Sequence, residues 1–191
     1  MEKWTVIRSE YLHESPFGNV RRDHCRLSNG KEIHDYIIHE YLNWGNVVAI
    51  TKQHELVLVK QYRHGLSDFV YELPAGGMAE AEDPEQAAIR ELREETGYTS
   101  ARQPIFLGEY GVNPAACTNK IYSYLLLDCE QSERQELDET EELEVVLVPF
   151  ADALRFLQKE TSIQLFSIAA LLLAKEKLKE LGIKMSSDDS R

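Results

Sequence analysis

The sequence predicts a mixed α+β fold or an α/β/α sandwich, and not a regular alternation of strands and helices. Its strand-like segments are followed by one early helix, then by more strands and two terminal helices. Hydrophobic residues make up 43% and charged residues 28% of the 191 residues, so we expect a packed core. The length suits one domain, with at most a small appended element.

The first 40 residues are predicted to be β-rich. "WTVIRSEYL" and "VRRDHCRL" alternate loosely between apolar and polar residues. Asn29 and Gly30 separate two strand-like runs, and Asn-Gly favours a hairpin because both positions accept positive φ. We therefore expect an N-terminal antiparallel β arm over residues 1–42, a main domain over 43–185 and a flexible tail over 186–191.

The central segment predicts a pair of antiparallel strands. Two β-branched runs, residues 47–50 and 56–62, flank a polar link at residues 52–54. "FVYELPAGG" then reads as a short strand that enters a loop of proline and glycine. Later strands are expected over three further stretches: "PIFLGEY", "KIYSYLLLDC" and "LEVVLVPF".

The clearest helix is "EDPEQAAIRELREETG". Asp83 suits the N-cap, Pro84 suits the first helical position, and Gln86 completes a capping-box pattern. Gly97 stands where a glycine usually ends a helix. A short helix is expected over "ADALRFLQKE". A longer one is expected over about residues 162–181, with this apolar set: Ile163, Phe166, Ile168, Ala170, Leu171 and Leu172.

Composition excludes several classes of function. A net charge of −12 argues against a surface that coats nucleic acid. Cys25, Cys117 and Cys129 are odd in number and form no CxxC pair, so neither a disulfide framework nor a thiolate zinc site is indicated. The first residues lack a secretory signal, and "SIAALLLA" is too short to span a bilayer. We expect a cytoplasmic protein with no membrane or nucleic-acid partner.

The early helix carries an unusual density of glutamates. At about 100° per residue, one side collects its apolar residues: Ala88, Ile89 and Leu92. Glu91 and Glu95 lie one turn apart on the neighbouring face, with Glu94 and Arg90 beside them. Partial desolvation there would strengthen their repulsion. Either this is a solvated edge with an Arg90–Glu94 ion pair, or a hard divalent cation with oxygen ligands relieves the repulsion.

The loop before the helix completes a longer pattern, G-x5-E-x7-R-E-L-x-E-E-x-G. Its fixed positions are Gly76, Glu82, Arg90, Glu91, Leu92, Glu94, Glu95 and Gly97. This pattern resembles the signature of the Nudix hydrolases at every fixed position, although Tyr98 follows where an aliphatic residue is more usual. The resemblance implies an α/β/α sandwich whose loop–helix–loop holds Mg²⁺ or Mn²⁺.

Carried over by position, the resemblance assigns roles to the residues of this motif. Glu91 and Glu95 would be the main carboxylate ligands of the ion, joined by the backbone carbonyl of Ala75. Glu94 would be a supporting carboxylate, and Arg90 would orient the glutamates. The catalytic residues implied within the motif are therefore Glu95, Glu94 and Arg90.

Three other motif positions would shape the loop. Glu82 would hold it through hydrogen bonds. Gly76 and Gly97 would serve the geometry of the backbone and not the chemistry.

Further stretches resemble the subgroup of ADP-ribose and other ADP-sugar pyrophosphatases: "QYR" at residues 61–63, "ELPAG" at 72–76, and Pro114. The resemblance implies metal-dependent hydrolysis of the pyrophosphate bond of a nucleoside diphosphate sugar. ADP-ribose would yield AMP and ribose 5-phosphate. After Pro114, "NPAACTNK" lacks the glycine and the later glutamate that the subgroup often has, so the substrate edge of the site departs from the pattern.

The acidic segment "ETEELEV" lies where the subgroup has a catalytic loop. Glu139 would be the general base and Glu141 a metal ligand, with Glu142 a rival for either role; ordinary solvated charge is the alternative. Arg63 would contact a phosphate or the terminal ribose, unless it is a surface cation at a strand end. Trp44 would stack on adenine, unless it is a core or interface tryptophan.

Two alternatives for function stay open. One is a Nudix hydrolase that acts on a GDP-sugar or a dinucleoside polyphosphate. The other is a module that keeps the fold and senses nucleotides without hydrolysing them. In the resembled subgroup the N-terminal β segment pairs with a second subunit, so the resemblance also implies a homodimer.

Overall fold

The structure is a computed structural model that describes residues 2–159 and 162–185. The tail expected over 186–191 lies outside the described residues. The chain divides into two compact units. The first consists of residues 1–43 and Tyr110–Lys120, and the second of Trp44–Glu109 and residues 121–191.

The first unit is built on a three-stranded antiparallel sheet in the order β1-β2-β3. Its strands are β1 (Thr5–His13), β2 (Asn19–Arg26) and β3 (Glu32–Glu40). The hairpin expected at Asn29-Gly30 is confirmed: it joins β2 to β3, and the Leu27 amide donates to the Lys31 carbonyl at 2.8 Å.

The segment Tyr110–Lys120 belongs to this unit because it bonds to the end of β3. The His39 amide donates to the Ala116 carbonyl at 2.7 Å, and the Thr118 amide donates to the His39 carbonyl at 3.1 Å. The Asn119 side chain donates to the Leu42 carbonyl at 3.1 Å. These bonds add an irregular segment to the sheet, and that segment contains Pro114.

The second unit is organised around a mixed eight-stranded sheet with the central order β11-β5-β4-β10-β8. In addition, β6 pairs with β5, β7 with β4, and β9 with β10. Strand β10 runs parallel to β4, whereas β5 runs antiparallel to β4 and to β11. The strands are β4 (Trp44–Thr51), β5 (Glu55–Arg63), β6 (Asp68–Glu72), β7 (Ala75–Gly77), β8 (Tyr98–Thr99), β9 (Ile105–Gly111), β10 (Lys120–Gln131) and β11 (Leu143–Pro149).

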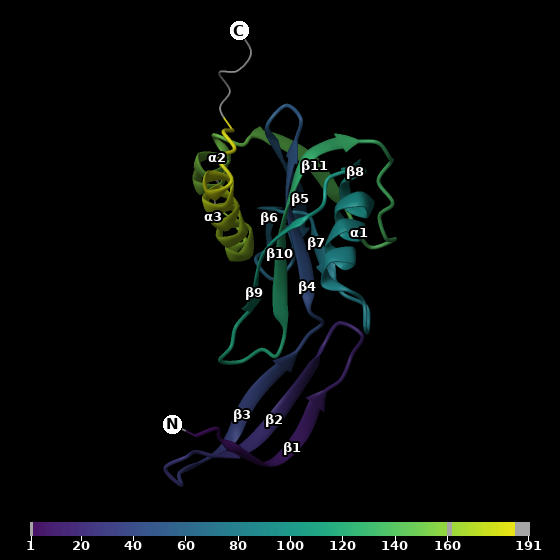
Figure 1. Ribbon diagram of the computed structural model, residues 1–191. Coiled ribbons are helices and arrows are strands. Elements are labelled where there is room, and N and C mark those ends of the chain that lie inside the picture. The colour runs from purple at the N-terminus through teal and green to yellow at the C-terminus, as the bar shows by residue number, and fades with distance from the viewer. Residues whose placement is uncertain (1, 160–161, 186–191) are drawn as a thin grey trace. The chain divides into compact units, whose positions relative to one another are not determined.

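Helices cover both faces of this sheet (Figure 1). Helix α1 (Pro84–Thr96) lies on one face, and α2 (Ala153–Lys159) and α3 (Leu165–Glu180) lie on the other. The side chains of β4 alternate between the two faces of the sheet. Val47 and Ala49 pack with α1, and Val48 and Ile50 pack with α2 and α3. The predicted sandwich with a mixed sheet is therefore confirmed.

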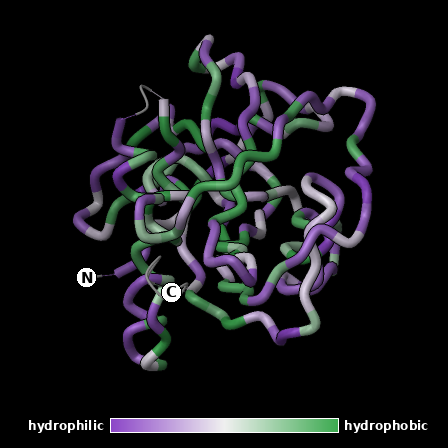
Figure 2. Tube along the Cα trace, turned by 90° about the horizontal axis from the view of Figure 1, so that it is seen from above, coloured by the Kyte–Doolittle hydropathy of each residue, from purple (hydrophilic) through white to green (hydrophobic). Residues whose placement is uncertain are grey.

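Hydrophobic residues are concentrated where these layers meet. Figure 2 shows the green, hydrophobic stretches mostly towards the middle of the trace and the purple, hydrophilic stretches mostly in its outer loops. Two buried clusters, one on each face of the sheet, form the core of the second unit. Within the described ranges, no helix is long and apolar enough to cross a membrane.

The last helix differs from the expectation in its start and in its buried face. It begins at Leu165, because Ile163 is extended and bridges Tyr71. Leu172, expected in the apolar set, is 45% exposed. Packing follows the residues at helical spacing that meet the sheet, and these are Ser167, Ala170, Leu171, Ala174 and Leu178.

Candidate active site

Helix α1 is held at both ends, which sets the direction of its glutamates. The carboxylate of Asp83 accepts from the amides of Glu85 at 3.0 Å and Gln86 at 3.2 Å, as expected for an N-cap. At the other end Gly97 adopts φ of 72°, and its amide donates to the Arg93 carbonyl at 2.8 Å. The expected start and end of the helix are both confirmed.

Glu95 is a buried carboxylate, with only 4% of the residue exposed. One of its oxygens accepts from the Ala75 amide at 3.0 Å, which ties the helix to β7. Burial raises the pKa of Glu95 to about 8, and the negative charges of Glu91 and Glu141 add to the effect. A charged carboxylate in this position therefore needs a compensating positive charge.

Glu91 is also largely buried, and it fills a space that Gly76 leaves open. Burial is the main cause that raises the pKa of Glu91. A Cβ atom added at Gly76 would lie 2.0 Å from the carboxyl carbon of Glu91 and 2.2 and 2.3 Å from its two oxygens. With the Glu91 carboxylate in this position, residue 76 therefore has no room for a Cβ atom.

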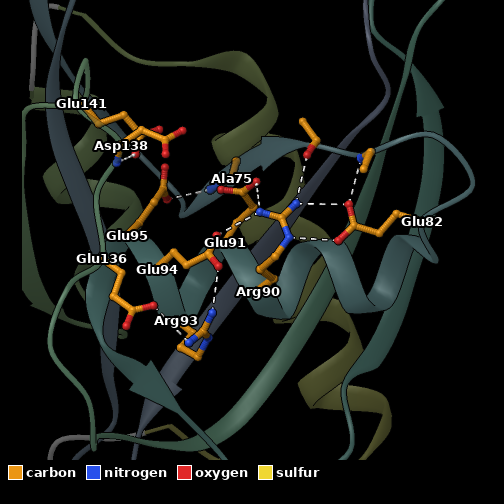
Figure 3. A network of polar contacts seen from close by, with 12 residues as sticks. Ala75, Glu82, Arg90, Glu91, Arg93, Glu94, Glu95, Glu136, Asp138 and Glu141 are labelled. Atoms are coloured by element: carbon orange, nitrogen blue, oxygen red, sulfur yellow. Dashed lines mark hydrogen bonds and ion pairs between the residues drawn. The ribbon is translucent and has the colours of Figure 1, made fainter.

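Arg90 joins the acidic residues of the motif into one network (Figure 3). Its Nε and Nη2 donate to the two oxygens of Glu82 at 2.9 and 3.1 Å, and Nη2 also donates to the Gly77 carbonyl at 3.2 Å. Its Nη1 donates to Glu91 at 2.7 Å and to Glu94 at 3.0 Å. The expected Arg90–Glu94 pair is present, but as one contact among several.

The hydrogen bonds of this network shift the pKa values of Arg90 and Glu82 in the direction that keeps both side chains charged. The hydrogen bond to Glu82 is the main cause that raises the pKa of Arg90. The same bond is the main cause that lowers the pKa of Glu82, which also accepts from the Ala79 amide at 2.8 Å. The loop before α1 is therefore fastened to the helix through a permanently charged pair.

The acidic loop before β11 lies against these carboxylates. The Asp138 amide donates to a side-chain oxygen of Glu141 at 3.1 Å, and the Glu141 amide donates to the Asp138 carbonyl at 2.9 Å. Figure 3 shows the Glu141 carboxylate pointing towards Glu95. The charge of Glu141 contributes to the raised pKa values of both Glu91 and Glu95. Three carboxylates from two distant segments thus converge.

An open groove of about 340 Å³ runs beside this cluster. Its lining residues come from the end of β5 and from the acidic loop: Gln61, Tyr62, Arg63, Glu139, Thr140, Glu141 and Glu142. The structure therefore brings Glu139 and Arg63 to one groove. Glu139 is exposed there, in contrast to Glu91 and Glu95.

Arg63 is anchored by Glu72, a residue to which the sequence analysis gave no role. Nη2 of Arg63 lies 2.5 Å from Glu72, and Nε lies 3.1 Å from each of its oxygens. Gln61 donates to the same carboxylate at 3.0 Å, and Glu72 is 3% exposed. In the sequence, the signal for such a partner was a charged residue, Glu72, between the apolar residues Tyr71 and Leu73.

Two predicted substrate residues, Trp44 and Pro114, are not among the residues that line this groove. Trp44 is half-buried at the start of β4, where it pairs with Gly77 of β7. Pro114 belongs to the first unit, where it packs against Gly111. The carboxylates all belong to the second unit.

The donor set fits a hard divalent cation. The carboxylates of Glu91, Glu95 and Glu141 are coupled by their charges beside the loop at Ala75, and histidine and cysteine contribute nothing to this cluster of described residues. All-oxygen sets suit Mg²⁺ and Mn²⁺. A divalent cation there would offset the burial and the mutual repulsion that raise the pKa of Glu95.

Comparison with family models finds two matches. A NUDIX domain model matches residues 43–168. A model described as the nucleoside diphosphate sugar hydrolase N-terminal domain matches residues 4–37. Together these matched ranges include the three-stranded sheet in part, helix α1 with its motif, and the acidic loop.

Individual proteins and one solved structure are also similar to this chain over most of its length. The ADP-ribose pyrophosphatase of Bacillus subtilis (strain 168) is 35% identical over 154 residues, which cover 80% of this chain and 82% of that protein. The methanol dehydrogenase activator of Bacillus methanolicus is 29% identical over 156 residues, covering 81% and 83%. A crystal structure of an ADP compounds hydrolase matches with a TM-score of 0.80 at 24% identity, covers 95% and 97% of the two chains, and supports the fold.

Proposed function

Because this chain belongs to the Nudix hydrolase family, we propose that it hydrolyses the pyrophosphate bond of a nucleoside diphosphate sugar, with ADP-ribose as the preferred substrate. The products of ADP-ribose would be AMP and ribose 5-phosphate. The observation that carries the proposal is the convergence of Glu91, Glu95 and Glu141 beside a groove that also contains Arg63. The N-terminal match to nucleoside diphosphate sugar hydrolases and the Bacillus subtilis relative support the choice of substrate class.

We assign the binding of Mg²⁺, with Mn²⁺ as the alternative, to Glu91, Glu95, Glu141 and the carbonyl of Ala75. When bound, such an ion lowers the pKa of a water molecule and neutralises charge on a diphosphate. Arg90 holds Glu91 and Glu94 in place through the bonds described above. The assignment makes Glu82 the residue that keeps the loop with Ala75 and Gly76 against α1.

Glu139 is proposed as the general base. It lines the groove, is exposed, and lies two residues before Glu141, so a proton taken from water would reach solvent without crossing the core. We expect Glu139→Gln to lower kcat by about 10²- to 10⁴-fold, which is the usual contribution of general acid–base catalysis. Steady-state kinetics with ADP-ribose and Mg²⁺ would measure this loss.

The matched variant is Glu142→Gln, because Glu142 lines the same groove and carries the same charge. A larger loss of kcat in that variant would move the base to Glu142. Near-normal activity in both variants would contradict a base in this loop.

Arg63 is proposed to contact a phosphate or the terminal ribose. Glu72, which also accepts a hydrogen bond from Gln61, holds the Arg63 guanidinium from one side, so its direction is set before substrate arrives. A prearranged arginine loses less freedom when it binds an anion than a lysine does. From the resemblance, we also propose that Trp44 stacks on adenine.

A panel of nucleotides tests the substrate. We expect the highest kcat/KM with ADP-ribose, lower values with other ADP-sugars, and the lowest with GDP-sugars and dinucleoside polyphosphates, when released phosphomonoester is measured with Mg²⁺. A GDP-sugar or dinucleoside polyphosphate that reacts faster than ADP-ribose would replace the proposed substrate. Binding of ADP-ribose without turnover would favour a nucleotide-sensing module instead.

We also propose a homodimer, formed through the β arm. The first unit exposes large apolar side chains that a partner would cover, and these are Trp4, Val6, Ile7, Tyr11, Leu12 and Phe17. Light scattering at micromolar concentration should give twice the 22.0 kDa of one chain, and a mass of one chain would contradict the dimer. Cys25, Cys117 and Cys129 are free, which supports a cytoplasmic location.

A further inference from the structure

A second group of metal-ligating side chains lies in the first unit, on strands β2 and β3. One nitrogen each from His24 and His34 and one oxygen from Glu32 lie within 4.8 Å of one another. Nε2 of His24 is 2.8 Å from Oε2 of Glu32, and the two imidazole rings are 4.2 Å apart between centroids. Neither the motif nor the groove of the second unit involves these residues.

The register of the two strands explains why the three side chains meet. Cys25 pairs with Ile33, but Asp23 pairs with Tyr36, so two residues of β3 face the single residue His24. Such a β-bulge re-aims side chains. Glu32 and His34 are two residues apart on one strand and therefore share a face of the sheet. The irregular register places His24 next to both of them.

The carboxylate in this group is oriented by a further contact. Arg26 donates from Nε to Oε1 of Glu32 at 2.9 Å, and its Nη2 lies 2.9 Å from the same oxygen. Oxygen Oε2 is left facing His24. Carboxylates that bind metal ions are commonly held by a hydrogen bond of this kind on the other oxygen.

The surroundings leave room for an ion with a water ligand. An open groove of about 230 Å³ is lined by Arg8, Glu10, Arg22, His24 and His34. Arg22 and Arg8 lie 2.8 and 3.7 Å from Glu10, so part of their positive charge is compensated. In a tetrahedral site with bonds of about 2.0–2.2 Å, neighbouring ligand atoms lie about 3.3 Å apart. Small rotations of these solvent-accessible side chains would reach that spacing.

We propose that His24, Glu32 and His34 bind a divalent transition-metal ion of the Zn²⁺ class, which would link β2 to β3. Two imidazoles with one carboxylate select such ions over Mg²⁺, which prefers oxygen ligands. The site is thus chemically distinct from the all-oxygen cluster of α1. An ion pair of His24 with Glu32 accounts for the positions of these two side chains only, whereas a bound metal ion accounts for the positions of all three.

Zn²⁺ titration of the full chain, in the presence of saturating Mg²⁺ and without substrate, tests the site. We expect the imidazole ¹⁵N resonances of His24 and His34 to shift at one equivalent of Zn²⁺, while those of His13, on β1 of the same unit, stay unchanged. By calorimetry, His24→Ala and His34→Ala should each weaken this binding step at least about tenfold, since even loss of an outer partner of a metal site costs about 10–100-fold. His13→Ala is the matched control and should bind as the wild type does.

Resonances of His24 and His34 that stay in place at one equivalent of Zn²⁺ would overturn the proposal, as would an unchanged isotherm in both alanine variants. Glu32→Gln provides a second test if an alanine variant fails to fold, because glutamine keeps the shape and removes the charge. The resonance measurement on the wild-type chain needs no variant at all. Since no turnover is measured, failure here leaves the proposed hydrolysis untouched, and the reverse also holds.

Discussion

Glu95→Gln is expected to lower Mg²⁺-dependent hydrolysis of ADP-ribose by more than about 100-fold, the upper range for loss of an outer partner of a metal site. The substitution keeps the shape of the side chain, and its amide oxygen can still accept from the Ala75 amide. It removes the buried carboxylate, which could otherwise carry a negative charge and bind the ion. Steady-state kinetics and calorimetric titration with Mg²⁺ would measure the losses of activity and of ion binding.

The control for this variant is Glu85→Gln, on the same helix but in its first turn. It changes the net charge equally and should keep kcat/KM within a few-fold of the wild-type value. Near-normal activity of Glu95→Gln, with an intact circular dichroism spectrum, would refute the assignment of Glu95 as a metal ligand.

The same substitution should change how stability depends on pH in the ion-free protein. The pKa of Glu95 is raised from 4.5 to about 8, so between these values the folded state holds its proton more tightly than the unfolded state. The favourable contribution of the protonated form is complete below pH 4.5 and is lost as the pH rises through 8. Glu95→Gln should therefore stabilise the ion-free protein relative to wild type more at pH 8 than at pH 5, as measured by urea unfolding with chelator.

Gly76→Ala is expected to abolish most activity while leaving the protein folded. The new Cβ would lie 2.0 Å from the carboxyl carbon of Glu91, and that carboxylate must move. Because this carboxylate is the far end of a flexible side chain, it can move without a shift of the backbone. The move breaks the 2.7 Å bond from Arg90, which costs about 1.5–3 kcal/mol for a charged hydrogen bond, and displaces a proposed metal ligand. We expect a loss of about 10²-fold or more in kcat/KM.

Gly65→Ala is the matched control, because a Cβ at Gly65 meets nothing within 4 Å. That variant should keep both activity and melting temperature. If Gly76→Ala were as active as Gly65→Ala, the position of the Glu91 carboxylate would not matter for hydrolysis. If Gly76→Ala instead unfolded the protein, the new Cβ would be displacing the backbone and not only the Glu91 side chain.

Local patterns predicted much of the fold because their causes are local. Asp83, Pro84 and Gly97 mark the ends of α1, and a cap depends only on backbone atoms a few residues away. The hairpin at Asn29-Gly30 follows from the turn conformation that Gly30 accepts, with φ of 83°; Asn29 does not adopt positive φ. The start of α3 was not predicted, because Ile163 is extended only through its bridge to Tyr71, far away in the sequence.

The motif of α1 was recognised by its resemblance to a family signature, whereas helical geometry alone left a solvated edge as an alternative. Which of its glutamates are buried could not be predicted, since burial depends on β7, on the acidic loop and on the sheet beneath them. The pairing of Arg63 with Glu72 likewise arises only when β5 and β6 lie side by side. The chain order of residue types thus indicates the candidate groups of the site, and the folded environment shifts their pKa values. It does so because desolvation and Coulomb repulsion act between segments that are far apart in the sequence.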